Sequence, residues 1–292
     1  MDTTSIAPAT SARASRRGSK ALRRFLRHPG GMLGFVLLAF LILVALFAPF
    51  VAPYDPLRVD PINALMPPSG EHWMGTDTLG RDVMSRVIFG ARISLRLGIV
   101  SVAIAMSLGV FLGVLAGYLG GRVDAVIMRV VDILLAFPSL VLALIAVFAL
   151  GPGLTNAMIA VGISSIPVYA RITRAEVLSA KENLYVQSAQ ALGAPASGIM
   201  FRHILPNIIA PNIVMGALGT GSAILAGAAL SFLGLGAQAP LPEWGLMLSQ
   251  GRGFMSLAWW LTVFPGVGIM ATVMSMNLLG DGLRDVLDPR LG

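Results

Sequence analysis

The sequence predicts an all-α fold, a polytopic membrane bundle of about six transmembrane helices. Hydrophobic residues make up 56% of the 292 residues and charged residues only 12%, whereas soluble domains carry about 25% charged residues. The chain also contains long stretches without any charge, and a helix needs about 20 apolar residues to cross a bilayer. These uncharged stretches are 30–54, 97–121, 133–170, 204–242 and 253–280.

Residues 1–29 form a basic tail. They hold seven of the 21 lysines and arginines of the chain, and a basic tail before an apolar stretch is typical of a cytoplasmic topology signal. The first span is expected at 32–50, because its uncharged stretch is longer than the roughly 7–15 apolar residues of a signal peptide. Residues 30–292 are expected to form one membrane domain.

The polar region after the first span ends in a segment, 82–92, that is predicted to be an amphipathic helix on the membrane surface. The second span is expected at 97–121. Gly109, Gly113 and Gly117 are spaced four residues apart in it, so they would form one small-residue face for close helix packing. The alternative is that these glycines are merely tolerated in lipid.

The uncharged stretch at 133–170 is long enough for two spans. Gly151-Pro152-Gly153 is a natural break, so the third and fourth spans are expected at 132–150 and 154–172, with a kink at Pro138 in the third. Asp132, near the start of the third span, is expected to pair with Arg129 one helical turn away. A role facing the pore is the alternative, because charges inside a membrane are costly.

The last two spans are expected at 212–232 and 258–279. Residues 230–236, with Pro240, Pro242 and Trp244, predict an interfacial or partly re-entrant loop between them, and a second span within 204–242 is the alternative. With six spans and the N-terminus inside, 15 lysines and arginines face the cytoplasm and 6 face the outside. This bias predicts that both termini are cytoplasmic.

A polar loop at 173–207 falls on the cytoplasmic side of this topology. Its segment 182–192 has good helix formers and no glycine or proline, Gly193 interrupts it, and Pro195 suits the first turn of a second short helix. Leu205-Pro206 then leads back into apolar sequence. The pattern predicts a helix, a glycine turn and a helix beside the membrane.

This loop resembles the "EAA" loop of ABC-importer permeases. In that family the loop is a cytoplasmic coupling helix that docks into a groove on the ATPase. The resemblance implies coupling roles for residues of the motif, but Gln187 stands where the family usually has an acid, and His203 where many members have an aliphatic residue. The residues that match the motif are Gln187, Ser188, Ala189, Gly193, Leu205 and Pro206.

Further stretches resemble the dipeptide and oligopeptide branch of these importers, in particular its C-type permease subunit. They are APYDP at 52–56, GTDTLGRDVMSRVIFGARISL at 75–95, LAGYLGGRVDAVIMRVVDILLAFPSL at 115–140, LSFLGLG at 230–236, WGLML at 244–248 and NLLGDGLRDVLDPRL at 277–291. Nickel and glutathione importers share this architecture. Gly227 departs from it, because related permeases often have Glu there.

The resemblance implies a multi-pass subunit of the plasma (inner) membrane. Its expected partners are a homologous second permease that completes a heterodimer, two ATP-binding subunits and an extracytoplasmic solute-binding protein. ATP binding would push the coupling helices, and the pore would alternate between inward- and outward-facing states. Dipeptides or oligopeptides would cross the membrane through this alternating access.

The sequence does not predict a catalytic site in this chain. No Gly-x-x-x-x-Gly-Lys-Ser/Thr loop is present, so ATP hydrolysis is expected on partner subunits and the chain is not expected to be an enzyme. No cofactor, metal site or nucleic-acid partner is expected, because cysteine is absent, the three histidines are isolated and the basic charge concentrates in the tail. An ion-driven secondary transporter is the alternative, although no pair of broken helices stands out. An intramembrane hydrolase or scaffold is a third class, against which no pair of nucleophile and base emerges from the sequence.

Overall fold

The computed structural model describes residues 24–287 of the chain. Most of the predicted basic tail and the final Asp288-Pro289-Arg290 lie outside these residues. The described part is helical, which confirms the predicted all-α class. Its α-helices are α2 (Pro29–Leu46), α3 (Ala48–Val51), α4 (Val83–Leu119), α5 (Gly121–Leu135), α6 (Ser139–Leu150), α7 (Leu154–Lys181), α8 (Leu184–Ala191), α9 (Ala196–Gly198), α10 (Leu205–Phe232), α11 (Trp244–Gly251) and α12 (Trp260–Leu287).

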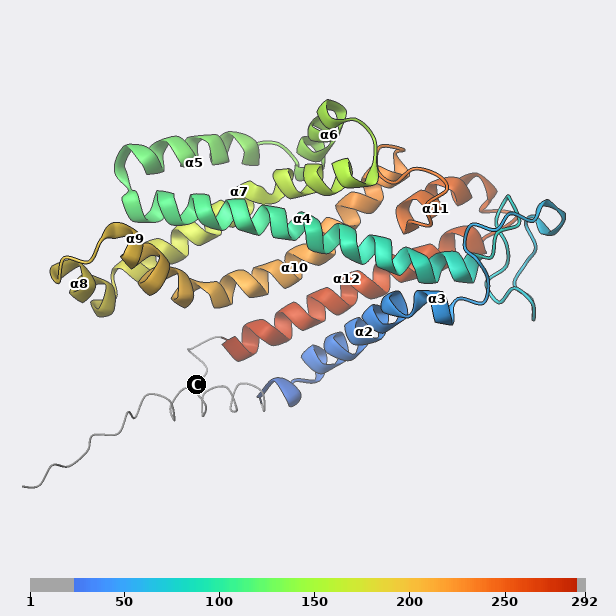
Figure 1. Ribbon diagram of the computed structural model, residues 1–292, viewed down its shortest axis with the longest axis horizontal. Helices are drawn as coiled ribbons and strands as arrows, with labels where there is room; N and C mark the ends of the chain where they lie inside the picture. The colour runs from blue at the N-terminus through green and yellow to red at the C-terminus, as the bar shows by residue number, and fades with distance from the viewer. Residues whose placement is uncertain (1–23, 288–292) are drawn as a thin grey trace, which may run out of the picture.

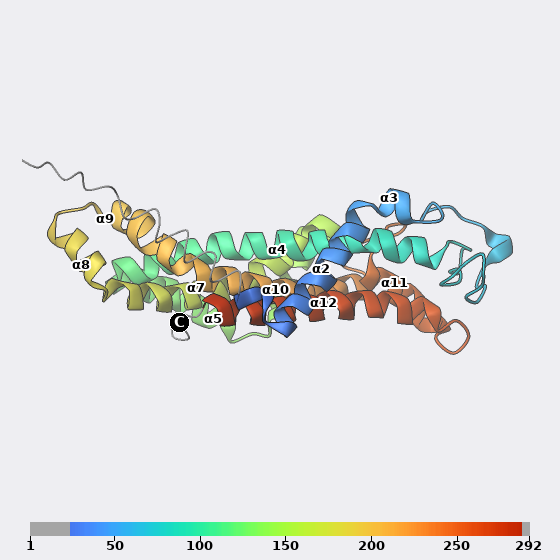
Figure 2. The same cartoon turned by 90° about the horizontal axis from the view of Figure 1, so that it is seen from below.

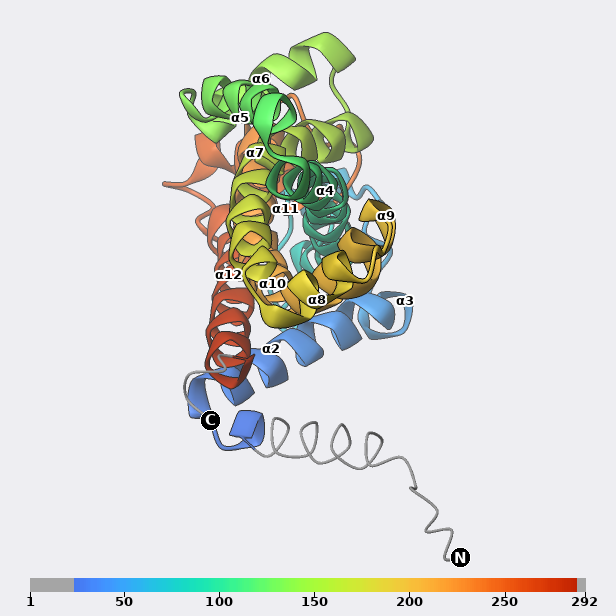
Figure 3. The same cartoon turned by 90° about the vertical axis from the view of Figure 1, so that its left-hand side faces the viewer.

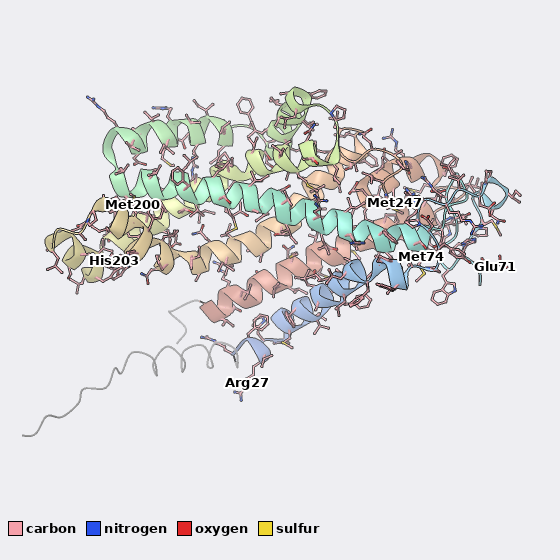
Figure 4. The ribbon with its side chains drawn as sticks, in the orientation of Figure 1. Arg27, Glu71, Met74, Met200, His203 and Met247 are labelled. Carbon is pink, nitrogen blue, oxygen red and sulfur yellow. The ribbon has the colours of Figure 1, made fainter. Side chains whose placement is uncertain are left out.

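The helices form an elongated bundle with two distinct ends (Figures 1 and 2). We call the end that carries α8 and α9 the arm end, and the end that carries residues 52–82 and α11 the loop end. Figure 4 shows Met200 and His203 at the arm end and Glu71 and Met74 at the loop end. Viewed from the arm end, α2 and α12 lie along one edge of the bundle and α5 and α6 along the opposite edge (Figure 3).

Within residues 24–287, four helices are long and apolar enough to cross a membrane, namely Pro29–Leu46, Val83–Leu119, Ala196–Phe232 and Trp260–Val286. The pair α5 and α6 would add a fifth if the two count as one span. α7 has 28 residues, but its second half carries Arg171, Arg174, Glu176 and Lys181. The structure therefore supports a polytopic bundle, while the count of six spans stays a prediction.

The predicted surface helix at 82–92 is wrong as a separate element. It is continuous with the second span, in one helix of 37 residues. Asp82 caps this helix, because its carboxylate accepts a hydrogen bond of 2.7 Å from the backbone N–H of Ser85. No proline interrupts the helix before it ends at Leu119, so the predicted surface segment and the span form one continuous helix.

The predicted third span is not a single kinked helix either. α5 ends at Leu135 and α6 begins at Ser139, and their axes differ by 96°. Pro138 lies at the break, where it lacks the N–H that would continue the helical ladder. The fifth span begins earlier than expected, because α10 accommodates Pro206 in its first turn and Pro211 further in. The side chain of Asn212 is buried there and accepts a hydrogen bond of 2.9 Å from the Thr173 hydroxyl.

The small-residue face of the second span is confirmed by its contact with α7. A Cβ atom placed on Gly109, Gly113 or Gly117 would lie 2.5, 2.6 or 2.8 Å from the Cβ atom of Tyr169, Thr173 or Val177, respectively. These partners are also spaced four residues apart. The two helices thus pack closely along the part of α4 from Gly109 to Gly117, where every fourth residue has no side chain.

We expect Gly113→Leu to destabilise the bundle by about 1–3 kcal/mol or more, because the added atoms would overpack this contact. Thermal unfolding of the purified protein in detergent would measure the effect. Ala103→Leu is the matched control, since Ala103 lies on the exposed face of the same helix. Equal unfolding temperatures for the two variants would contradict the close contact between α4 and α7.

The loop end is held by buried charges. The Asp77 carboxylate accepts hydrogen bonds from the backbone N–H groups of Leu79 (2.8 Å) and Arg81 (3.0 Å) and from the Arg81 Nε (2.6 Å). It also lies 3.5 Å from the Nε of Arg86, whose side chain is 1% exposed. Asp77 is therefore the acid shared by two buried arginines.

The helix α11 is fixed at the same end by Glu243. This side chain is buried and accepts hydrogen bonds from the backbone N–H groups of Gly245 (3.0 Å) and Leu246 (2.8 Å). Burial raises the pKa of Glu243, while the two N–H groups oppose the rise. The loop after the fifth span thus returns to the bundle as a short capped helix at the loop end.

Candidate functional site: the helical arm

The predicted helix–turn–helix loop is an arm that projects from the bundle between α7 and α10 (Figure 1). We use "arm" for residues 182–205. Its first helix is α8, and its return consists of α9 and a π-helical turn at Ile199–Ile204 that continues into α10. The two helices of the loop were therefore predicted correctly, and the π-helical turn was not.

The turn of the arm is a Schellman motif. The N–H of Ala194 donates to the carbonyl of Ala189 (3.0 Å), and the N–H of Gly193 donates to the carbonyl of Gln190 (2.9 Å). Gly193 has a φ of +76°, a conformation that costs a residue with a side chain about 1–2 kcal/mol. Nothing lies within 4 Å of the position that a Cβ atom would take. The glycine is needed for backbone shape, not for space within this chain.

The arm is seated on its own hydrophobic cluster. Val186 and Ala189 from α8 are buried against Ile199 and Ile204 from the return and against Val177 from α7. Leu205 is partly buried in the same cluster. A push on the arm would therefore be transmitted to α7 and α10, because a close-packed interior resists compression.

The opposite face of the arm is exposed and apolar. Leu184 is 80% exposed and Leu192 is 87% exposed. With Ser188 they are spaced four residues apart, so the three side chains share one face of the arm. Large apolar side chains grouped on a projecting element indicate a binding surface.

The structure places the six predicted residues in three different settings. Ala189 and Leu205 face the inner cluster, whereas Gln187, Ser188 and Pro206 are exposed and Gly193 forms the turn. The Gln187 amide donates to the carbonyl of Glu182 (3.2 Å), the residue that caps the C-terminus of α7, so this bond lies within the arm. Leu184 and Leu192 were missed, although their spacing around Ser188 would have revealed the exposed face.

Charged side chains fix the C-terminal half of α7, which leads into the arm. The Lys181 ammonium donates to the carbonyls of Gly117 (3.3 Å) and Tyr118 (3.0 Å) in the last turn of α4. The Arg174 guanidinium holds the Asp124 carboxylate of α5 through two hydrogen bonds. The arm therefore continues a helix whose end is tied to two neighbours.

Asp132 was expected to pair with Arg129, and this is wrong. Its carboxylate pairs with Arg171 of α7, and both side chains are more than half exposed. The helix α5 lies beside α7, so a residue distant in sequence takes the place of the neighbour one turn away. An exposed pair of this kind contributes at most about 1 kcal/mol.

Gly227, at the position where the resemblance implies Glu, lies at a tight contact between α10 and α4. A Cβ atom there would overlap the side chain of Leu97. Both residues are buried. Any side chain at position 227 would require Leu97 to move, and the glycine allows the close contact between the two helices.

The comparisons with known proteins agree with this architecture. Residues 109–292 match the family described as "binding-protein-dependent transport system inner membrane component". The chain belongs to this family. Residues 17–68 match the "N-terminal TM domain of oligopeptide transport permease C". This family member is therefore an inner-membrane component of a transport system.

Similar curated proteins cover nearly the whole chain. The dipeptide transport system permease protein of Alkalihalophilus pseudofirmus is 46% identical over 272 residues, which is 93% of this chain and 90% of that protein. The di/tripeptide transport system permease protein of Pseudomonas aeruginosa is 47% identical over 273 residues, 91% and 90% of the two chains. The glutathione transport system permease protein of Pectobacterium atrosepticum is 45% identical over 270 residues, 92% and 90%.

Proposed function

We propose that this family member is one permease subunit of an ATP-driven importer, which moves dipeptides and short oligopeptides across the inner membrane by alternating access. The coupling role is supported by the arm. Its helix α8 packs on a hydrophobic cluster on one side and exposes leucines on the other. The peptide substrate is supported by the relatives, because permeases of dipeptides and of di/tripeptides are 46% and 47% identical to this chain over most of its length.

In this proposal the arm end faces the cytoplasm and residues 30–292 act as one permease domain. Two ATP-binding subunits bind beneath a heterodimer of this chain and a homologous permease, and a solute-binding protein delivers peptide at the loop end. The sequence contains no Walker A loop, so the energy enters through the arm. Its exposed leucines would seat in a groove of the ATPase, and its base would transmit the movement to α7 and α10.

Glutathione is a second candidate substrate, because a glutathione permease is 45% identical to this chain. It is itself a tripeptide, so both candidates are short chains with free carboxylates. Competition between labelled dipeptide and glutathione for uptake by the reconstituted complex would separate them. Nickel, the other solute that the resemblance implies, would be expected to compete with neither.

We expect a cysteine at Ser188 to crosslink to cysteines in the ATPase groove in a nucleotide-dependent manner, because Ser188 lies on the exposed face of the arm. The chain has no native cysteine, so a single substitution suffices. Ala189→Cys is the matched control, since the adjacent side chain is only 8% exposed and faces the inner cluster. Uptake of labelled dipeptide by the same complex should require ATP.

If Ser188→Cys failed to crosslink in an assembled complex, the arm would be a surface loop without a role in coupling. An ion-driven transporter would then be the leading function, and uptake should follow an ion gradient without ATP. Equal crosslinking of the cysteines at 188 and 189 would show that the arm is not seated as described.

A further inference from the structure

A hollow of about 910 Å³ lies at the loop end, on the exposed face of α4. It is bounded by α4 on one side, by α3 and the chain that follows it on another, and by Leu241 and Pro242 on a third. Its volume falls in the range of small-molecule sites, about 300–1,000 Å³. The residues that give it its chemistry are Tyr54, Asp55, Phe89, Arg92, Ile93 and Arg96.

Arg92 and Arg96 dominate the charge of the hollow. They are four residues apart on α4, so they share one helical face, and both are exposed. Among residues 24–287, neither guanidinium has a salt bridge or a side-chain hydrogen bond. The uncharged stretch of α4 begins at Leu97, which places the pair beside the apolar part of the helix. Arginines there are costly and also oppose the positive-inside bias, so a function is the default expectation.

The other walls fit a zwitterion rather than a simple anion. Asp55 contributes a carboxylate, one oxygen of which accepts a hydrogen bond of 2.8 Å from the backbone N–H of Leu57. Tyr54 and Phe89 contribute aromatic surface. A short peptide carries a carboxylate, an ammonium and an apolar body, and arginine is the side chain best suited to hold a carboxylate through two hydrogen bonds.

We propose that this hollow is an entry site for peptide, in which Arg92 and Arg96 hold the C-terminal carboxylate and Asp55 faces the ammonium. This inference rests on the function proposed above and adds residues that contact the substrate. The site would receive the peptide at the loop end, and the peptide would then pass along α4. The phosphate of an anionic lipid would satisfy the same arginines, and the experiment separates the two.

The first test measures binding without transport. A cysteine at Ile93, in the wall of the hollow, is alkylated with N-ethylmaleimide in nanodiscs that contain the complex and only phosphatidylcholine. We expect alanyl-alanine to slow alkylation in a saturable manner and its C-terminal amide to have no effect. Arg92→Gln/Arg96→Gln in the same background should abolish this protection.

The second test measures transport with saturating binding protein and peptide, so that differences arise after delivery. We expect Arg92→Gln/Arg96→Gln to lower dipeptide uptake about tenfold or more, the loss expected when hydrogen bonds to a charged group are removed. Arg92→Lys/Arg96→Lys should recover part of the uptake. Arg58→Gln/Arg252→Gln is the control, because it removes the same charge at the loop end outside the hollow.

The outcomes separate this inference from the proposed function. Protection of the cysteine by free peptide supports the site even if uptake proves independent of ATP. Absence of protection, with normal ATP-driven uptake in the double glutamine variant, would overturn the site and leave the function intact. Slowed alkylation only when phosphatidylglycerol is added, with no effect of peptide, would assign the arginines to lipid and also overturn the site.

Discussion

Replacing Asp77 with alanine is expected to destabilise the loop end by about 3–5 kcal/mol, the cost of removing one partner of a buried ion pair. Asp77 is the carboxylate between Arg81 and Arg86, and both arginine side chains are at most 5% exposed. Without it two buried guanidinium groups face each other without an acid. The backbone N–H groups of Leu79 and Arg81 would also lose their acceptor.

Limited trypsin cleavage after Arg81 and Arg86 would measure this effect, because both sites are buried in the native fold. Asp77→Asn should be intermediate, since an amide oxygen can still accept from the backbone while the charge is lost. Asp55→Ala is the matched control, an exposed aspartate in the same region whose carboxylate accepts one backbone hydrogen bond. Cleavage of Asp77→Ala at the rate of this control would refute the buried network.

Replacing Gly193 with leucine is expected to lower ATP-coupled uptake about tenfold or more, while ATP hydrolysis by the complex persists. The backbone cost is about 1–2 kcal/mol, because leucine would have to adopt a φ of +76°. A shift of the turn would move Leu192, the most exposed leucine of the arm. In the proposed function this residue meets the ATPase, so a small displacement breaks the coupling. Uptake and ATP hydrolysis would be measured together in proteoliposomes.

Two further variants separate the possible causes. Asn tolerates the left-handed conformation, so Gly193→Asn should restore the turn and most of the uptake. Gly193→Ala carries the backbone cost with little added bulk. If alanine and leucine impair uptake equally, the turn geometry is the cause, and if only leucine does so, the side chain blocks docking. Normal coupled uptake in Gly193→Leu would remove Gly193 from the coupling machinery.

The sequence by itself determined the membrane class, the small-residue face of α4 and the helix–turn–helix pattern of the arm. These features follow from local chemistry. Uncharged stretches of 20 residues or more are stable only in lipid or a deep core, glycines four residues apart share one helical face, and a glycine after a helix allows the left-handed turn. The resemblance to peptide permeases rested on short motifs spread along the chain, and the family match agrees with it.

Tertiary structure alone decided the contacts between segments distant in sequence. Asp132 pairs with Arg171 because α5 lies beside α7, and Gly227 contacts the side chain of Leu97 because α10 packs against α4. The inward direction of Ala189 depends on the return of the arm, which buries it. The hollow around Arg92 and Arg96 forms because residues 53–57 and 241–242, distant in sequence, both lie beside α4. Sequence patterns report the neighbours along one helix, whereas packing decides which helix covers each face.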